Sequence, residues 1–176
     1  MSNDNPYSPR RILARAVGHI LTNVPELARL WGKARYTQSF SESPLVRVRK
    51  PLNACRLALI TTGGVHQRDQ EPFNMSDSRG DPTYRELPAE TPRERLMITH
   101  DYYNHEPADT DLNILLPMGL CHELVQAGHI GSLATCYSFM GHIEPPHVDT
   151  LNNKTAPQVA GKLKQDQVDA VLLTPA

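Results

Sequence analysis

The sequence predicts an α/β protein whose core is a Rossmann-like parallel sheet covered by helices, with a helical extension before it. Four apolar runs have the length and composition of buried strands, at 56–62, 94–99, 130–139 and 168–174. Two helical patterns with a proline in the first turn lie among the later runs, at 117–128 and 155–164. Alternation of apolar strands with helices is typical of a parallel sheet that is buried on both faces.

A basic amphipathic segment precedes the first strand, so we assign residues 1–50 to an extension with a linker and 51–176 to the α/β domain. Six apolar residues recur every three or four positions and predict one helical stripe: Leu13, Val17, Ile20, Val24, Leu27 and Trp31. Pro25 divides the segment into two short helices, because proline removes a backbone donor, and residues 36–52 are expected to be a linker. The stripe needs a partner, which is the α/β domain, a second copy or a membrane surface. Packing on protein is the preferred interpretation.

Charge is divided unevenly along the chain, although the total is only −1. Residues 1–56 hold ten basic and three acidic residues, whereas residues 57–176 hold eight basic and sixteen acidic residues. The two segments can attract each other, or the first can meet another acidic surface. The total charge does not suggest nucleic acid as a partner.

The three cysteines are too few and too far apart for a disulfide framework. The N-terminal segment lacks the apolar centre of a signal peptide, and no apolar run approaches the ~20 residues that span a membrane. We therefore expect a cytoplasmic protein with reduced thiols and no membrane span.

The first predicted strand opens into a polar loop at Thr61-Thr62-Gly63-Gly64, which His66 follows. Ligands of α/β proteins sit outside the carboxyl ends of the strands, so we expect Thr62, Gly63, Gly64 and His66 to line a substrate or partner cleft. The two glycines either allow a tight turn or present backbone N–H groups to an anion. The loop has neither the Walker A pattern nor the dinucleotide-binding glycine pattern.

A second polar loop follows the 94–99 strand, and we expect His100 and Asp101 to face the same cleft. A His–Asp pair either fixes one imidazole tautomer or binds a metal, for which His105, Asp109 and Asp111 are the nearby additional ligands. A hydrogen-bonded loop that shapes a pocket is the preferred interpretation. We therefore predict no metal site.

None of the cysteines is predicted to be catalytic. Cys136 lies near the end of the 130–139 strand and needs a base such as His142 or His66 beside it to act as a nucleophile. A free cysteine is more often a small buried hydrophobe. Cys121, on the predicted 117–128 helix, is a weaker candidate still.

The last predicted strand, 168–174, is apolar throughout and has no helix after it. A parallel sheet is normally covered on both faces, so this strand is expected to be partly uncovered. The pattern predicts that another chain covers it or that the domain is truncated.

Eight segments, in this order, resemble the selenoprotein B subunits of the glycine, sarcosine, betaine and D-proline reductases: ALITTGGVH, DQEPFN, GDPTYRELP, ITHDYYNH, DTDLNILLP, ELVQAGHIGSLA, YSFMGHI and KLKQDQVDAVLLTPA. The ordered set is more specific than any single segment, and the D-proline reductase selenoprotein subunit is the nearer type. The resemblance covers roughly residues 52–176 and leaves residues 1–50 outside.

The resemblance implies an oligomeric cytoplasmic reductase that cleaves a C–N bond of an amino acid or a related amine. It implies a selenocysteine, or a cysteine in its place, as the redox residue, and a partner subunit whose pyruvoyl group captures the amine. In the family the selenocysteine follows the final strand, after a turn that resembles Leu173-Thr174-Pro175-Ala176. We therefore expect that residues 1–176 alone lack reductase activity and that the gene continues past Ala176 through a selenocysteine codon, which sequencing of the gene checks.

A second interpretation comes from another class: a non-catalytic α/β protein that binds a small anion or a metal. It uses the Gly63-Gly64 turn and the loop with His100 and His105. Stoichiometric metal in the purified protein favours this binding protein, whereas a selenocysteine or cysteine after Thr174 favours the reductase.

Overall fold

The computed structural model describes residues 9–34 and 46–176, and every structural statement below concerns these residues. They form a mixed α/β domain around a mostly parallel five-stranded sheet. The sheet contains β1 (Arg56–Thr61), β3 (Arg85–Leu87), β5 (Ser132–Leu133), β6 (Cys136–Ser138) and β7 (Ala170–Thr174). A separate antiparallel pair consists of β2 (Val65–Gln67) and β4 (Leu96–Ile98).

Strand β1 is the centre of the sheet. β7 pairs with it in parallel along five residues, from Leu57 opposite Ala170 to Thr61 opposite Thr174. β5 and β6 share the other edge of β1, β5 at its start and β6 at its end, both in parallel. β3 closes the sheet beyond β6 in the antiparallel direction.

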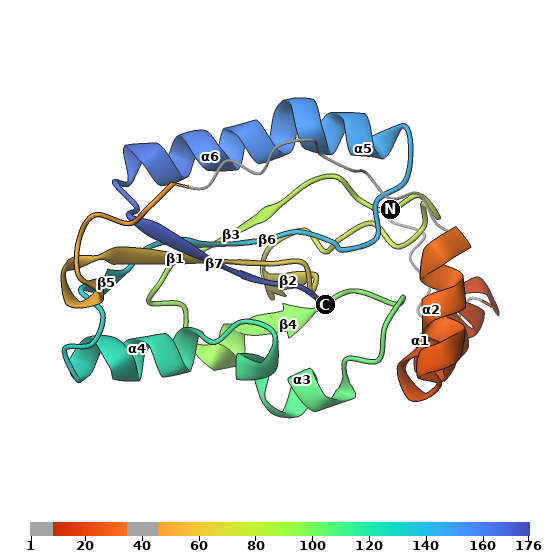
Figure 1. Cartoon of the computed structure of the whole chain (residues 1–176). Coiled ribbons are helices and arrows are strands. Elements are labelled where there is room, and N and C mark those ends of the chain that lie inside the picture. The colour runs from red at the N-terminus through yellow and green to blue at the C-terminus, as the bar shows by residue number, and fades with distance from the viewer. Residues whose placement is uncertain (1–8, 35–45) are drawn as a thin grey trace.

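Helices cover both faces of this sheet, as Figure 1 shows. Helix α6 (Ala156–Gln165) lies on one face and α4 (Met118–Gln126) on the other. Two short helices, α3 (Glu106–Thr110) and α5 (His147–Thr150), precede α4 and α6 respectively. A π-helical stretch, Leu151–Thr155, joins α5 to α6.

Alternation of side chains along the strands explains the two apolar layers. Leu59 is fully buried and belongs to the cluster that includes Met118 and Cys121 of α4. On the other face, Val159 of α6 packs with Tyr137 and Phe139. The predicted α/β class with helices on the sheet is confirmed.

Three details of the predicted strands differ in the structure. The 94–99 strand does not join the main sheet, because Gly64 has a φ of 69° that redirects the chain after β1, and β2 then pairs with β4. The segment between the first two predicted strands, for which no strand was predicted, holds the short strands β2 and β3. The 130–139 strand is interrupted after Leu133 and forms β5 and β6.

The extension forms α1 (Pro9–Asn23) and α2 (Pro25–Ala34), so the predicted division at Pro25 is confirmed. Most of the predicted apolar stripe is not buried: Leu13, Ile20, Val24 and Leu27 are exposed, whereas Val17 is partly buried. The side chain of Trp31 and the linker residues 36–45 lie outside the described part of the chain. Both helices stand at the end of the sheet toward which β1 and β7 point (Figure 1).

Strand β7 is only partly covered, as expected from the sequence. Val171, Leu172 and Leu173 are all exposed. Because neighbouring residues of a strand point to opposite faces, exposed apolar side chains stand on both faces of the sheet at this edge. Over residues 9–34 and 46–176, we find no helix with the length and apolarity needed to cross a membrane.

Replacement of Leu59 by Ala tests whether the α4 side of the sheet is the main core. The substitution removes a fully buried side chain of β1, and we expect the free energy of unfolding to fall by about 2–5 kcal/mol in urea denaturation. Leu173→Ala, on the exposed edge strand, is the control and is expected to change it by less than about 0.5 kcal/mol. Equal losses from the two variants would contradict this assignment of the core.

Candidate functional site

The carboxyl ends of β1 and β7 meet at a turn formed by Thr61 to Gly64. The carbonyl oxygen of Thr174 accepts hydrogen bonds from the Thr62 backbone N–H (3.2 Å) and from the Thr61 hydroxyl (3.1 Å). The Ala176 backbone N–H donates to the Thr62 hydroxyl oxygen at 3.0 Å. The residues after β7 are therefore held against Thr62, one of the predicted site residues.

The backbone N–H groups of this turn are used inside the protein. Gly63 donates to the Thr61 hydroxyl oxygen at 3.1 Å, and Gly64 donates to the Phe139 carbonyl oxygen at 3.0 Å. Together with the Thr62–Thr174 bond, these contacts occupy three successive donors. The turn is thus a tight, internally bonded turn, and the alternative in which these N–H groups bind an anion lacks available donors.

The surroundings of Gly64 exclude a side chain, whereas those of Gly63 are less strict, because the end of a leucine side chain can shift. A Cβ atom on Gly64 would stand 2.6 Å from the Thr99 carbonyl oxygen and 2.9 Å from Cβ of His100. A Cβ atom on Gly63 would stand 2.8 Å from a methyl group of Leu115. Absence of a side chain therefore lets the loop that follows β4 lie directly against the turn that follows β1.

This contact brings His100 beside the glycine turn, by a different route from the expected one, and its place in a cleft stays a prediction. We expected His100 to follow a neighbouring strand of the main sheet, whereas β4 reaches the turn through its pairing with β2. The Tyr103 hydroxyl donates to the Gly63 carbonyl oxygen at 2.9 Å. The rings of His100 and Tyr103 meet edge to face, with centroids 4.8 Å apart.

The imidazole of His100 also meets the loop after β6. Its Nε2 lies 3.3 Å from the Gly141 backbone N–H and its Nδ1 lies 3.3 Å from the Tyr102 backbone N–H. A neutral imidazole accepts at one nitrogen only, and a protonated imidazole accepts at neither. The neutral His100 ring therefore accepts from either the Gly141 N–H or the Tyr102 N–H, and protonation removes that hydrogen bond.

Burial keeps His100 neutral. The pKa of His100 is lowered to about 4, mainly by desolvation and also by the nearby His142 and His105, while Asp101 opposes the shift. Burial also raises the pKa of the Tyr103 phenol. Near neutral pH this wall of the site consists of uncharged rings.

Asp101 and His66 are the two other predicted site residues with polar side chains near this turn, and each has its own hydrogen-bond partners. The Asp101 carboxylate is buried and accepts a hydrogen bond from Nε of Arg15 in α1 at 3.0 Å. His66 is buried in β2, where Nδ1 donates to the Gln67 carbonyl oxygen (2.7 Å) and Nε2 accepts from the Thr99 hydroxyl (2.8 Å). These bonds give His66 a structural task behind the turn, and its substrate contact stays a prediction.

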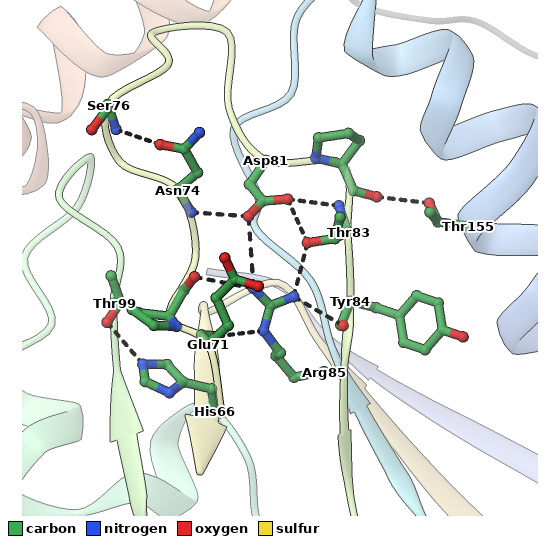
Figure 2. Close-up of polar contacts among 12 residues, drawn as sticks. His66, Glu71, Asn74, Ser76, Asp81, Thr83, Tyr84, Arg85, Thr99 and Thr155 are labelled. Carbon is green, nitrogen blue, oxygen red and sulfur yellow. Dashed lines mark hydrogen bonds and ion pairs between the residues drawn. The ribbon is translucent and has the colours of Figure 1, made fainter. Parts of the chain in front are cut away.

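The long loop between β2 and β3 is fixed by Arg85, as Figure 2 shows. The guanidinium group donates to the carbonyl oxygens of Glu71 (2.6 Å) and Pro72 (3.1 Å) and lies 4.4 Å from the ring centre of Phe73. The buried carboxylate of Asp81 accepts from the backbone N–H groups of Asn74 (2.9 Å) and Thr83 (2.8 Å). Charged side chains thus order the loop between β2 and β3, for which the sequence predicted no helix or strand.

The residues considered for a metal site make local hydrogen bonds and do not converge on one point. His105 donates to the Asp109 carboxylate at 2.7 Å, and the Asp111 carboxylate accepts from the Asn113 backbone N–H at 3.0 Å. In the part of the chain that the structure describes, no three His, Cys, Asp or Glu side chains are grouped as metal ligands. The geometry therefore offers no ligand set for the metal-binding alternative.

The cysteine thiols are equally unsuited to covalent chemistry. All three are buried. Burial raises the pKa of the Cys136 thiol to about 12 and also raises the pKa of Cys121. A thiolate is the reactive form of cysteine, so neither of these two thiols is a nucleophile at neutral pH.

A mostly apolar cavity of about 480 Å³ opens beside Thr62. It lies between the sheet and α6 and is bordered by Ile60, Phe139, Gly141 and Val159 among others. A ligand that enters it brings an apolar group next to the end of β7.

Sequence reasoning missed four residues that shape this region: Tyr103, Gly141, Arg15 and Arg85. Tyr103 and Gly141 follow the predicted strands 94–99 and 130–139. The rule that ligands sit outside the carboxyl ends of strands could therefore have indicated both residues. Arg85 and Arg15 act across 14 and 86 positions of the chain, and no local pattern indicates such contacts.

Comparisons with known proteins identify the family of the chain. The family model for glycine/sarcosine/betaine reductase selenoprotein B matches residues 35–176. D-proline reductase subunit gamma from Acetoanaerobium sticklandii is 32% identical over 128 residues, which cover 72% of this chain and 51% of that protein. The chain therefore spans about half the length of this curated relative. No solved structure matches the chain at a significant level.

Replacement of Gly64 by Ala tests the close approach of the two loops. Both the positive φ and the contact with the Thr99 carbonyl oxygen oppose a side chain, so we expect a loss of about 2 kcal/mol or more in the free energy of unfolding. Gly128→Ala separates the two causes, because Gly128 has a φ of 73° with nothing within 4 Å of an added Cβ, and we expect a loss of about 1 kcal/mol. If both variants lose the same stability in urea denaturation, the contact with Thr99 is not decisive.

The low pKa of His100 predicts a pH dependence of stability. With a pKa of about 4 in the folded chain and 6.5 as its ordinary value, the unfolded chain binds more protons between these values, so stability is complete above pH 6.5 and is lost as the pH falls toward 4. We expect His100→Gln to remove a component of about 2 kcal/mol from the difference between pH 7.5 and pH 5 in urea denaturation. The exposed His129→Gln variant is the control. An unchanged difference in His100→Gln would show that His100 is not buried as a neutral group.

Proposed function

The chain belongs to the glycine/sarcosine/betaine reductase selenoprotein B family, and we propose that it forms the substrate-orienting part of a reductase subunit that cleaves a C–N bond of an amino acid or a related amine. The D-proline reductase type is favoured, because the relative at 32% identity is a subunit of that enzyme. A Rossmann-like arrangement of the whole subunit, a cytoplasmic location and a division of the chain near residue 50 belong to this proposal.

One observation carries the proposal: the end of β7 is bonded to the turn after β1. The Thr174 carbonyl oxygen and the Ala176 N–H both bind this turn. A redox residue that follows Thr174, as the resemblance implies, then stands beside Thr62, Gly63 and the apolar cavity.

We propose that the redox group is a selenocysteine or a cysteine in its place, as the resemblance implies, and that a pyruvoyl-containing subunit is the partner. The selenolate would supply the nucleophile, and this chain would supply its surroundings. Thr62 and the glycine turn fix one wall, while His100 and Tyr103 add a neutral, hydrogen-bonded support behind it.

The alternative of a non-catalytic protein for a small anion or a metal has weaker support. The N–H groups of the glycine turn are engaged, and His105, Asp109 and Asp111 serve separate local contacts. Metal analysis of the purified protein remains the direct test of this alternative.

The reductase proposal is tested with the full-length gene product and its partner subunit, purified together from the native source. We expect oxidation of dithiothreitol that depends on at least one of glycine, sarcosine, betaine or D-proline. Gly64→Ala should lower this rate by about 100-fold, because a displacement of about 1 Å in a site costs that much. Gly161→Ala, in α6 with open space around it, should retain the rate. An assembled complex that oxidises the thiol with none of the four substrates would overturn the proposal.

A further inference from the structure

Helix α1 meets the α/β domain at the loop that carries His100 and Asp101. Nε of Arg15 donates to Oδ1 of Asp101 at 3.0 Å. Only 3% of the Asp101 side chain is exposed, whereas about half of the Arg15 side chain is exposed. The extension thus brings a cation from the surface to a buried carboxylate at the candidate site.

Backbone packing supports this contact independently of charge. Gly18 is buried, and a Cβ atom on it would stand 3.0 Å from the carbonyl carbon of Tyr102 and 3.1 Å from the backbone nitrogen of Tyr103. Such a short approach to backbone atoms favours a glycine at this position, because a Cβ atom there would need the loop to shift. Helix α1 therefore rests directly on the backbone of the loop, one turn away from the Arg15 contact.

The loop under α1 is the one that supports both strand-end turns. His100 lies against the Gly141 N–H, and Tyr103 donates to the Gly63 carbonyl oxygen. A shift of the loop would displace the two residues together. Helix α1 therefore acts on the turn after β1 indirectly, through His100 and Tyr103.

We propose that Arg15 is a positioning residue, which fixes the loop from His100 to Tyr103 and thereby the glycine turn beside the end of β7. Helix α1 precedes residue 35, where the family match begins, so this support comes from the chain's own extension. The catalytic meaning of this role rests on the proposed function, but the positioning itself is measurable in the absence of any substrate.

The test compares Arg15→Ala with Arg15→Lys and with the control Arg29→Ala in the full chain. Arg29 pairs with Glu26 on the exposed surface of α2. Two quantities are measured: amide hydrogen exchange at Tyr102, Tyr103 and Gly141, and the pKa of His100 from its ring signals in NMR.

We expect Arg15→Ala to speed exchange at these amides by about two- to fivefold, which is the range for an ion pair with one exposed partner. We expect it to raise the pKa of His100 by about 0.5–1, because a looser loop reduces the desolvation that lowers this pKa and Asp101, which opposes the lowering, loses its cationic partner. Arg15→Lys should restore most of both effects, and Arg29→Ala should change neither. Lysine keeps the positive charge beside Asp101, so rescue by lysine assigns the effect to the ion pair.

Wild-type exchange and an unchanged His100 pKa in Arg15→Ala would overturn the proposal. If Arg15→Ala fails to fold, Gly18→Ala is the second variant, because it lifts α1 from the loop while Arg15 is retained. Accelerated exchange at Tyr102 and Tyr103 is then expected, and its absence counts against the proposal. Neither measurement depends on reductase activity, so a failure of the proposed function and a failure of this inference are distinguishable.

Discussion

The parallel pairing of β1 with β7 is the constraint on which the candidate site depends. Five consecutive residue pairs, from Leu57 and Ala170 to Thr61 and Thr174, bring both strand ends to the same level of the sheet. The bonds from Thr61 and Thr62 to the Thr174 carbonyl oxygen extend this register into the turn. The apolar side chains of β7 are exposed on both faces of the sheet, so their burial does not select this register. The position of the site thus depends on the backbone pairing and on the bonds of Thr61 and Thr62 with Thr174.

A second constraint is the way in which buried charges and polar groups are neutralised around the turn. Arg85 is largely enclosed yet has carbonyl acceptors and the face of Phe73, and Asp81 has backbone donors. Burial of an unpaired charge is costly, whereas a charge with full hydrogen bonding is tolerated and specifies one arrangement. His100 avoids a buried charge in another way, because desolvation lowers its pKa and keeps the imidazole neutral. The loops around the site are therefore held by specific polar contacts, although few of their residues belong to regular elements.

The sequence predicted those features that are local or periodic. The apolar runs located β1 and β7, and the prolines located the starts of α2 and α6. The short strands β2 and β3 were not predicted, because three residues carry no clear period and their pairing depends on the φ of Gly64 and on the contacts of Arg85. The strand-end rule placed Gly64 and His100 together, but pairing of β2 with β4 is what joins them. The apolar stripe of the extension misled in one respect, since α1 uses Gly18 and Arg15 to meet the domain.

The chemistry of the turn and its neighbours indicates a division of labour. His100 is neutral, the pKa of the Tyr103 phenol is raised, and burial also raises the pKa of Cys136. A wall of this kind holds no ionised nucleophile at neutral pH, so it cannot compete with a low-pKa group for an electrophilic carbon or be oxidised in its place. It can, however, exclude water and hold a substrate through shape, since the neighbouring cavity is mostly apolar. The described residues therefore suit a surface that orients a ligand, and in the proposed function the redox residue would supply the nucleophile beside Thr62.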